Sequence, residues 1–221
     1  MRHFVRVAEV ADIPGRNEHE YPPGFFDRTD PADDAAFYSF PRYVTHIDNG
    51  AIAAVGALYD ELEIDGAVLD LMSSWVSHFR DAPDELTVLG MNADELAANP
   101  QAHAWVVHDL NENPVLPFPA DTFDHAVCCV SVDYLTDPVA VFADVARVLR
   151  PGGLFVCTFS NRLFPTKAIR GWLATDDDTH MEIVTSYFAA AGAYEPAVMQ
   201  RRTAADHRGD PLFGVWARVR E

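Results

Sequence analysis

The chain has 221 residues, of which 49% are hydrophobic and 23% charged, a composition typical of one globular domain with a sizeable core. Its formal net charge of −18 argues against nucleic acid and anionic membranes as partners, because both are bound through basic surfaces. The sequence has no apolar run of about 18 residues, and no apolar stretch typical of a signal peptide, so we expect a cytoplasmic protein. The oligomeric state stays open.

The acidic and the basic residues are each dominated by one residue type. Most acids are Asp, and Lys167 is the only lysine beside many arginines. An Asp-rich, Lys-poor surface suits high salt, where screening removes self-repulsion. Codon usage in a GC-rich genome would give the same bias, and both interpretations stay open.

Residues 1–40 are predicted to be irregular, with "YPPGFFDRTDPADD" as a clear loop. A helix covering a cleft, a lid, is expected over 41–64. Pro41 suits its first position, and apolar residues follow at helical spacing from Val44 to Leu62.

The remainder, 65–221, alternates apolar runs with helical segments. A helix is predicted after Asp137, with Pro138 in its first turn, and another from Thr179 to Gly192, with Thr179 and Glu182 in capping-box spacing. Near-continuous apolar strands between helices indicate a parallel sheet covered on both faces. The seven predicted strands are 67–72, 87–91, 104–110, 125–132, 154–159, 195–200 and 212–219. We therefore expect one α/β domain with a doubly wound, seven-stranded, mostly parallel sheet, the last two strands forming a hairpin.

Three cysteines, Cys128, Cys129 and Cys157, lie inside apolar runs. No CxxC pair and no Cys/His spacing of a metal site occurs. Buried, reduced thiols are the expected state, and no metal site is predicted.

Ligands of open α/β sheets bind beyond the carboxyl ends of the strands. In this sequence, polar residues directly follow the apolar strands at those positions. They are Asp70 to Trp75, Asn92, Asp109 with Leu110, Ser131 to Tyr134, and Ser160 to Arg162.

The stretch from Asp109 to Phe159 contains "LPFPADTFD" before one strand and "VARVLRPGGLFV" leading into the next. It resembles the class I S-adenosylmethionine-dependent methyltransferases of the small-molecule, ubiquinone/menaquinone type. The resemblance implies a Rossmann-like seven-stranded fold and S-adenosylmethionine as cofactor. It covers residues 65–160 well and the rest by element order.

The resemblance also implies a cofactor site, with departures from the family pattern. Asp70 matches the acid after the first strand, Asp109 and Leu110 match the pair that holds the adenine, and Ser131 lines the cofactor. The turn "LDLMSSW" puts Met72 and Ser74 where the family has glycines, with Ser73 between them, and Asn92 replaces the acid that holds the ribose. Glycine lets a backbone approach a ligand and adopt positive φ, so an altered pocket floor is expected.

Two segments are expected to cover the cleft. Arg42 and His46, four residues apart, would share one face of the predicted helix, with His46 either a base or a structural histidine. Arg162, Lys167 and Arg170 form a local basic cluster that either binds an anionic substrate or balances the acids at 176–178. Tyr134 is a further candidate for substrate contact.

Methyl transfer needs proximity and exclusion of water rather than a fixed catalytic motif. The sequence therefore predicts a methyltransferase acting on a small molecule, which is anionic if the basic cluster binds it rather than balancing the acids at 176–178. The alternative is a binding or regulatory protein that keeps the fold, supported by the altered turn and Asn92. A nicotinamide enzyme is disfavoured because no G-x-G-x-x-G follows a strand. Met72 filling the pocket would favour the alternative.

Overall fold

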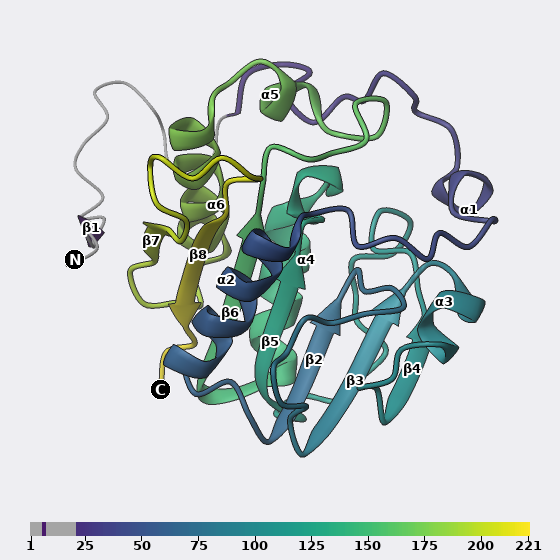
Figure 1. Cartoon of the computed structure of the whole chain (residues 1–221), viewed down its shortest axis with the longest axis vertical. Coiled ribbons are helices and arrows are strands. Elements are labelled where there is room, and N and C mark those ends of the chain that lie inside the picture. The colour runs from purple at the N-terminus through teal and green to yellow at the C-terminus, as the bar shows by residue number, and fades with distance from the viewer. Residues whose placement is uncertain (1–5, 8–20) are drawn as a thin grey trace.

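Five parallel strands form the centre of the sheet, and antiparallel strands extend one edge (Figure 1). The computed structural model describes residues 6–7 and 21–221, and within them the order is β1-β7-β8-β6-β5-β2-β3-β4. The predicted seven strands are confirmed, and a two-residue strand pairs with β7 at the edge. Expectations for residues 1–5 and 8–20 lie outside the described residues. The strands are β1 Arg6–Val7, β2 Ala67–Leu71, β3 Glu85–Gly90, β4 Ala104–Val107, β5 Phe123–Cys129, β6 Leu149–Phe159, β7 Val198–Arg201 and β8 Phe213–Arg218.

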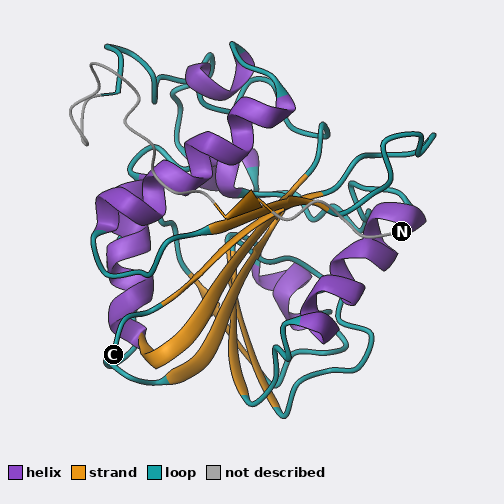
Figure 2. Cartoon of the chain, turned by 90° about the vertical axis from the view of Figure 1, so that its left-hand side faces the viewer, coloured by secondary structure: helices purple, strands orange, loops and turns teal. Residues whose placement is uncertain are grey.

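Side chains alternate between two cores along each central strand. In β5, Ala126 and Cys128 face one core, and Val127 faces the other. Figure 2 shows the helices on both sides of the sheet that close these cores. Because both faces are covered, the strands are almost continuously apolar.

Two helices pack on one face of the sheet and two on the other. The helices α2 (Asn49–Glu61) and α3 (Ala93–Ala97) contribute Val55, Leu58 and Leu96 to one core. On the opposite face lie α4 (Pro138–Val148) and α6 (Asp177–Ala191), and the short helices are α1 (Asp34–Phe37) and α5 (Arg170–Leu173). Among the described residues, no helix is both long and apolar enough to cross a membrane.

The ends of α4 and α6 follow local rules. Asp137 caps α4 by accepting a hydrogen bond from Ala140 N at 3.3 Å, as predicted, and Gly192 ends α6 with φ of 72°. The predicted capping box of α6 is wrong. Asp176, three residues before Thr179, is the cap, and its Oδ1 accepts from both the amide and the hydroxyl of Thr179.

The predicted helix over 41–64 is also shorter than expected. Asp48 accepts from Ala51 N at 2.8 Å, so α2 begins at Asn49, eight residues after Pro41. Before that, backbone groups bond to other elements instead: Arg42 N donates to Glu95 Oε1, and Val44 O accepts from Trp75 Nε1. Tertiary contacts thus override the helical spacing. Residues 38–46, which we call the strap, are not helical.

Candidate functional site

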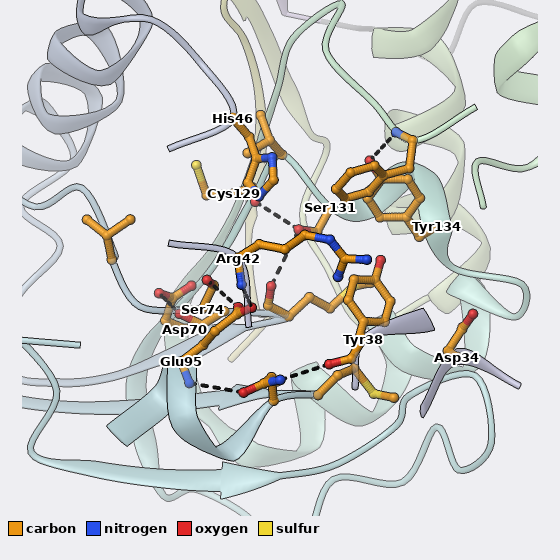
Figure 3. Close-up of a pocket in the computed structure, with 18 of the residues that line it drawn as sticks. Asp34, Tyr38, Arg42, His46, Asp70, Ser74, Glu95, Cys129, Ser131 and Tyr134 are labelled. Atoms are coloured by element: carbon orange, nitrogen blue, oxygen red, sulfur yellow. Dashed lines mark hydrogen bonds between the residues drawn. The ribbon is translucent and has the colours of Figure 1, made fainter. Parts of the chain in front are cut away.

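A cavity of about 260 Å³ lies beyond the carboxyl ends of the central parallel strands, where the α/β rule places a ligand site. It is covered by the strap and by the loop after β6 (Figure 3). Of the predicted site residues, it brings together Arg42, His46, Asp70, Met72, Ser73, Ser74, Asn92, Asp109, Leu110, Ser131, Tyr134 and Arg162. Lys167 does not line it.

The turn after β2 contains no glycine, and its backbone conformation and packing show how the cavity nevertheless stays open. Met72 itself adopts a positive φ of 53°, and its side chain packs against the core on the α4 side. Ser73 N donates to Leu89 O at 2.8 Å, so the turn lies directly on the end of β3. A Cβ at Gly90 would be 2.2 Å from Ser73 O. The glycine that close approach requires is therefore in β3, and Met72 leaves the cavity open.

Backbone strain concentrates around the cavity. Of the six non-glycine residues with positive φ, four line it: His46, Met72, His78 and Val130. Positive φ is especially unfavourable for the β-branched Val130. Such strain persists only where surrounding structure imposes it, and it clusters at ligand sites.

Asp70 lies under this turn with 2% of its surface exposed. Burial raises its pKa to about 7, although Ser73 Oγ donates a hydrogen bond to it at 2.6 Å. The Asp70 carboxyl group therefore titrates near neutral pH. A bound cation beside it would favour the ionised form.

Both ends of the Asn92 side-chain amide already have hydrogen-bond partners within the protein. Its Oδ1 caps α3 by accepting from Asp94 N and Glu95 N, and its Nδ2 donates to Tyr38 O at 2.9 Å. The expected contact with ribose hydroxyls would have to compete with these bonds.

Glu95 is a cavity residue that the sequence analysis missed. It is 8% exposed, and its two oxygens accept from Arg42 N at 2.6 Å and from Ser74 Oγ at 2.7 Å. An acid in the first turn of the helix after Asn92 was the signal available in the sequence.

Asp109 and Leu110 form the far wall. Asp109 Oδ1 accepts from Asn111 N at 2.8 Å, which holds the carboxylate in place, while its Oδ2 has no hydrogen-bond partner among the described residues. Leu110 is 4% exposed and presents an apolar surface beside it. A free carboxylate oxygen beside a leucine suits a flat, nitrogen-rich ring.

Two histidines line the strap side of the cavity. Burial lowers the pKa of His78 to about 4 and also lowers the pKa of His46, so both rings are neutral at pH 7. His46 packs edge-on against Phe164 at 5.3 Å between ring centroids. Its use as a base stays a prediction.

The predicted basic cluster does not act as a unit. Lys167 is 1% exposed, and its Nζ lies 3.0 Å from Asp34, 3.1 Å from Asp30 and 2.8 Å from Ala32 O. Arg162 lines the cavity but pairs with Asp210 at 2.8 Å. The expectation that Lys167 binds substrate is thus corrected, because a buried ammonium needs the paired acids around it.

Comparison with known proteins agrees with this geometry. Residues 71–157 match the family model described as "Methyltransferase domain". A segment of 100 residues is 32% identical to malonyl-[acyl-carrier protein] O-methyltransferase of Hahella chejuensis. That match covers 44% of this chain and 33% of the relative, so the chain spans about a third of the curated relative it matches.

Solved structures show the same fold. An S-adenosylmethionine-dependent methyltransferase from Mesorhizobium loti aligns with TM-score 0.51 at 19% identity, over 75% of this chain and 97% of that one. Phosphoethanolamine N-methyltransferase 2 of Haemonchus contortus, in complex with S-adenosyl-L-methionine, aligns with TM-score 0.54 at 12% identity, over 76% and 52%. The order of the strands and the position of the cleft are those of the Rossmann-like methyltransferase fold. Residues 71–157 are similar to a methyltransferase domain, the solved structures show that the fold is shared, and no finding singles out the ubiquinone/menaquinone type.

Proposed function

We propose that the chain transfers a methyl group from S-adenosylmethionine to a small molecule that carries negative charge. The open cavity beyond β2 to β5 is the observation that carries this proposal, because Met72 is turned into the core instead of filling it. The alternative, a binding or regulatory protein that keeps the fold, was supported by the altered turn and Asn92, and this turn leaves the cavity open. The family match over 71–157 gives independent support.

The residues present fit the cofactor. In this proposal Asp109 Oδ2 accepts from the adenine amine, and Leu110 packs on the ring. Asp70, Met72, Ser73 and Ser74 surround the amino-acid end, with Ser131 beside them. Asn92 keeps its capping role and borders the ribose. The cofactor supplies a methyl group on a positively charged sulfur.

The chain's own residues position the acceptor and exclude water. The strap is fixed over the cavity by hydrogen bonds from Asn92 to Tyr38 O, from Arg42 N to Glu95, and from Trp75 to Val44 O. It brings Arg42 and His46 to the side opposite Asp109, with Tyr134 and Arg162 beside them. Holding two reactants in line supplies most of the rate enhancement of such a transfer.

Negative charge on the acceptor has two supports. Arg42 and Arg162 line the cavity, and the Hahella chejuensis relative is named for O-methylation of a malonyl group. If the acceptor oxygen belongs to a carboxylate, it is already ionised at pH 7 and needs no base. His46 is required only for an acceptor that must lose a proton.

Titration calorimetry with S-adenosylmethionine and S-adenosylhomocysteine tests the proposal. We expect micromolar binding of both, weakened at least about tenfold by Asp109→Ala, since a charge-assisted hydrogen bond is lost. Glu112→Ala is the matched control, because Glu112 is exposed and does not line the cavity. If neither compound binds at low or molar salt, the proposal is wrong and a ligand-binding protein on this fold remains.

A further inference from the structure

The guanidinium of Arg42 is a cavity feature that the proposed cofactor contacts leave unused. It lies against three aromatic rings, with Cζ 4.6 Å from the ring centroid of Phe37, 5.7 Å from Tyr38 and 5.6 Å from Phe164. We call these rings the aromatic collar. Figure 3 shows Arg42 between Tyr38 and Tyr134 on one side and Asp70, Ser74 and Glu95 on the other.

One nitrogen of this guanidinium lacks a hydrogen-bond partner. Nη2 donates to Phe37 O at 2.8 Å, but Nη1 is buried without any partner among the described residues. Glu95 bonds to the backbone amide of Arg42 and not to its side chain. A buried donor that carries charge is costly to leave unpaired, so this group is suited to a partner that the protein does not provide.

The other cations near the cavity are satisfied. Arg162 pairs with Asp210, and Lys167 pairs with Asp34 and Asp30. Of the lysines and arginines, Arg42 and Arg162 line the cavity. Among the described residues 21–221, no carboxylate lies within ion-pair distance of Arg42, whereas Asp210 pairs with Arg162. The chain has 34 acids and 16 bases, so a half-buried arginine without an acidic partner is not explained by a shortage of acids.

We propose that Arg42 is the receptor for a carboxylate that binds in this cleft. The guanidinium fork matches the geometry of a carboxylate, and the aromatic collar holds the fork in place while excluding water that would weaken the pair. Nη1 is buried, so the guanidinium must turn toward the cavity that Arg42 already lines. The inference deepens the proposed function and rests on it for the identity of the ligand. The carboxylate belongs either to the amino-acid end of the cofactor or to the methyl acceptor.

Two variants separate charge from geometry. Arg42→Met removes the charge and keeps an apolar side chain of similar length, and Arg42→Lys keeps the charge without the fork. Arg150→Met is the matched control, since Arg150 pairs with Asp124 at the opposite end of the sheet. Thermal unfolding checks that each variant folds, and Arg42→Lys decides the question if Arg42→Met does not fold.

Calorimetry uses two ligand pairs that differ in the carboxylate. S-adenosylmethionine is compared with its decarboxylated form, and malonate with the neutral malonamide, each with and without S-adenosylhomocysteine. If the cofactor supplies the carboxylate, Arg42→Met weakens S-adenosylmethionine about 10- to 100-fold and leaves the decarboxylated form unchanged. If the acceptor supplies it, cofactor binding stays unchanged and malonate binding is lost.

Equal binding of every ligand by wild type and Arg42→Met overturns the inference, as does a wild-type protein that binds no carboxylate. A wild type that binds malonate but no adenosyl compound refutes the proposed methyl transfer. In that case malonate binding alone tests whether Arg42 binds a carboxylate. Failure of the proposed methyl transfer can therefore be distinguished from failure of the inference about Arg42.

Discussion

Replacing Asp34 by Asn should destabilise the protein strongly, because Asp34 neutralises two buried cations. Its carboxylate accepts from Arg28 Nη1 at 2.9 and 2.7 Å and from Asn111 Nδ2 at 2.9 Å, and Lys167 Nζ lies 3.0 Å away. The side chains of Asp34, Arg28 and Lys167 are 5%, 9% and 1% exposed. The substitution keeps the size of the side chain but removes the charge, which leaves Arg28 and Lys167 with Asp30 as the nearest acid.

Removing one partner of a buried ion pair costs about 3–5 kcal/mol. Of a total stability of about 5–15 kcal/mol, this is a large share. For a chain of this size each kcal/mol lowers Tm by roughly 2–4 °C, so we expect a fall of roughly 6–20 °C. Urea unfolding at pH 7 measures the change in free energy directly.

The control is Asp60→Asn, which makes the same change in an exposed pair. Asp60 and Arg80 are 49% and 53% exposed, and such pairs contribute about 0–1 kcal/mol. Burial alone would raise the pKa of Asp34, but hydrogen bonds from Arg28, Asn111 and Lys167 outweigh it and hold the pKa below its usual value. The stabilisation is therefore present above about pH 4 and is lost as pH falls through the folded-state pKa. A loss below about 1 kcal/mol for Asp34→Asn, no larger than for Asp60→Asn, would refute the reasoning.

Three further changes have defined outcomes. Burial raises the pKa of Asp133 to about 8, so the folded state binds the extra proton and stability should fall as pH rises from about 4 to 8. Asp133→Asn, which cannot titrate, should reduce that fall in a urea-derived stability profile and leave the part that Asp70 contributes up to about pH 7, and an unchanged profile would contradict the assignment. Asn92→Ala removes the cap of α3 and should cost about 0.5–2 kcal/mol in urea unfolding; no loss would mean that the cap contributes nothing. With a net charge of −18, thermal stability should rise between about 0.1 and 2 M KCl as screening shortens from ~10 Å to below ~3 Å, and a flat or falling curve would rule out adaptation to salt.

The sheet could be predicted because its strands obey a local rule. Strands such as "HAVCCVSV" are apolar on both faces, and the structure places Ala126 and Val127 in opposite cores. The polar residues at the strand exits were predicted for a related reason, since all parallel strands bring their carboxyl ends to one edge.

The predictions that were wrong or incomplete concern features set by residues distant in the sequence. Apolar spacing from Val44 favoured a helix, but Glu95 and Trp75 bind the backbone of the strap, and Asp48 sets the start of α2. Lys167 was predicted to meet substrate because nothing local shows that Asp34, more than a hundred residues earlier, lies beside it. Glu95 was missed because its burial is created by the strap.

The roof of the cavity is held partly by hydrogen bonds between residues far apart in the sequence. Lys167 Nζ donates to Ala32 O across 135 residues, and the reciprocal bonds between Asp48 and Asp210 cross 162. During synthesis, which proceeds from the N-terminus, the strap can bond to Trp75, Asn92 and Glu95 early, but the anchor that Asp210 gives to Asp48 at the start of α2 comes only after residue 210 has emerged. The parallel strands β2 to β6 are all complete by Phe159. A chain truncated between 160 and 210 therefore has the parallel strands that form the floor of the site, but its roof lacks the bonds between Asp48 and Asp210.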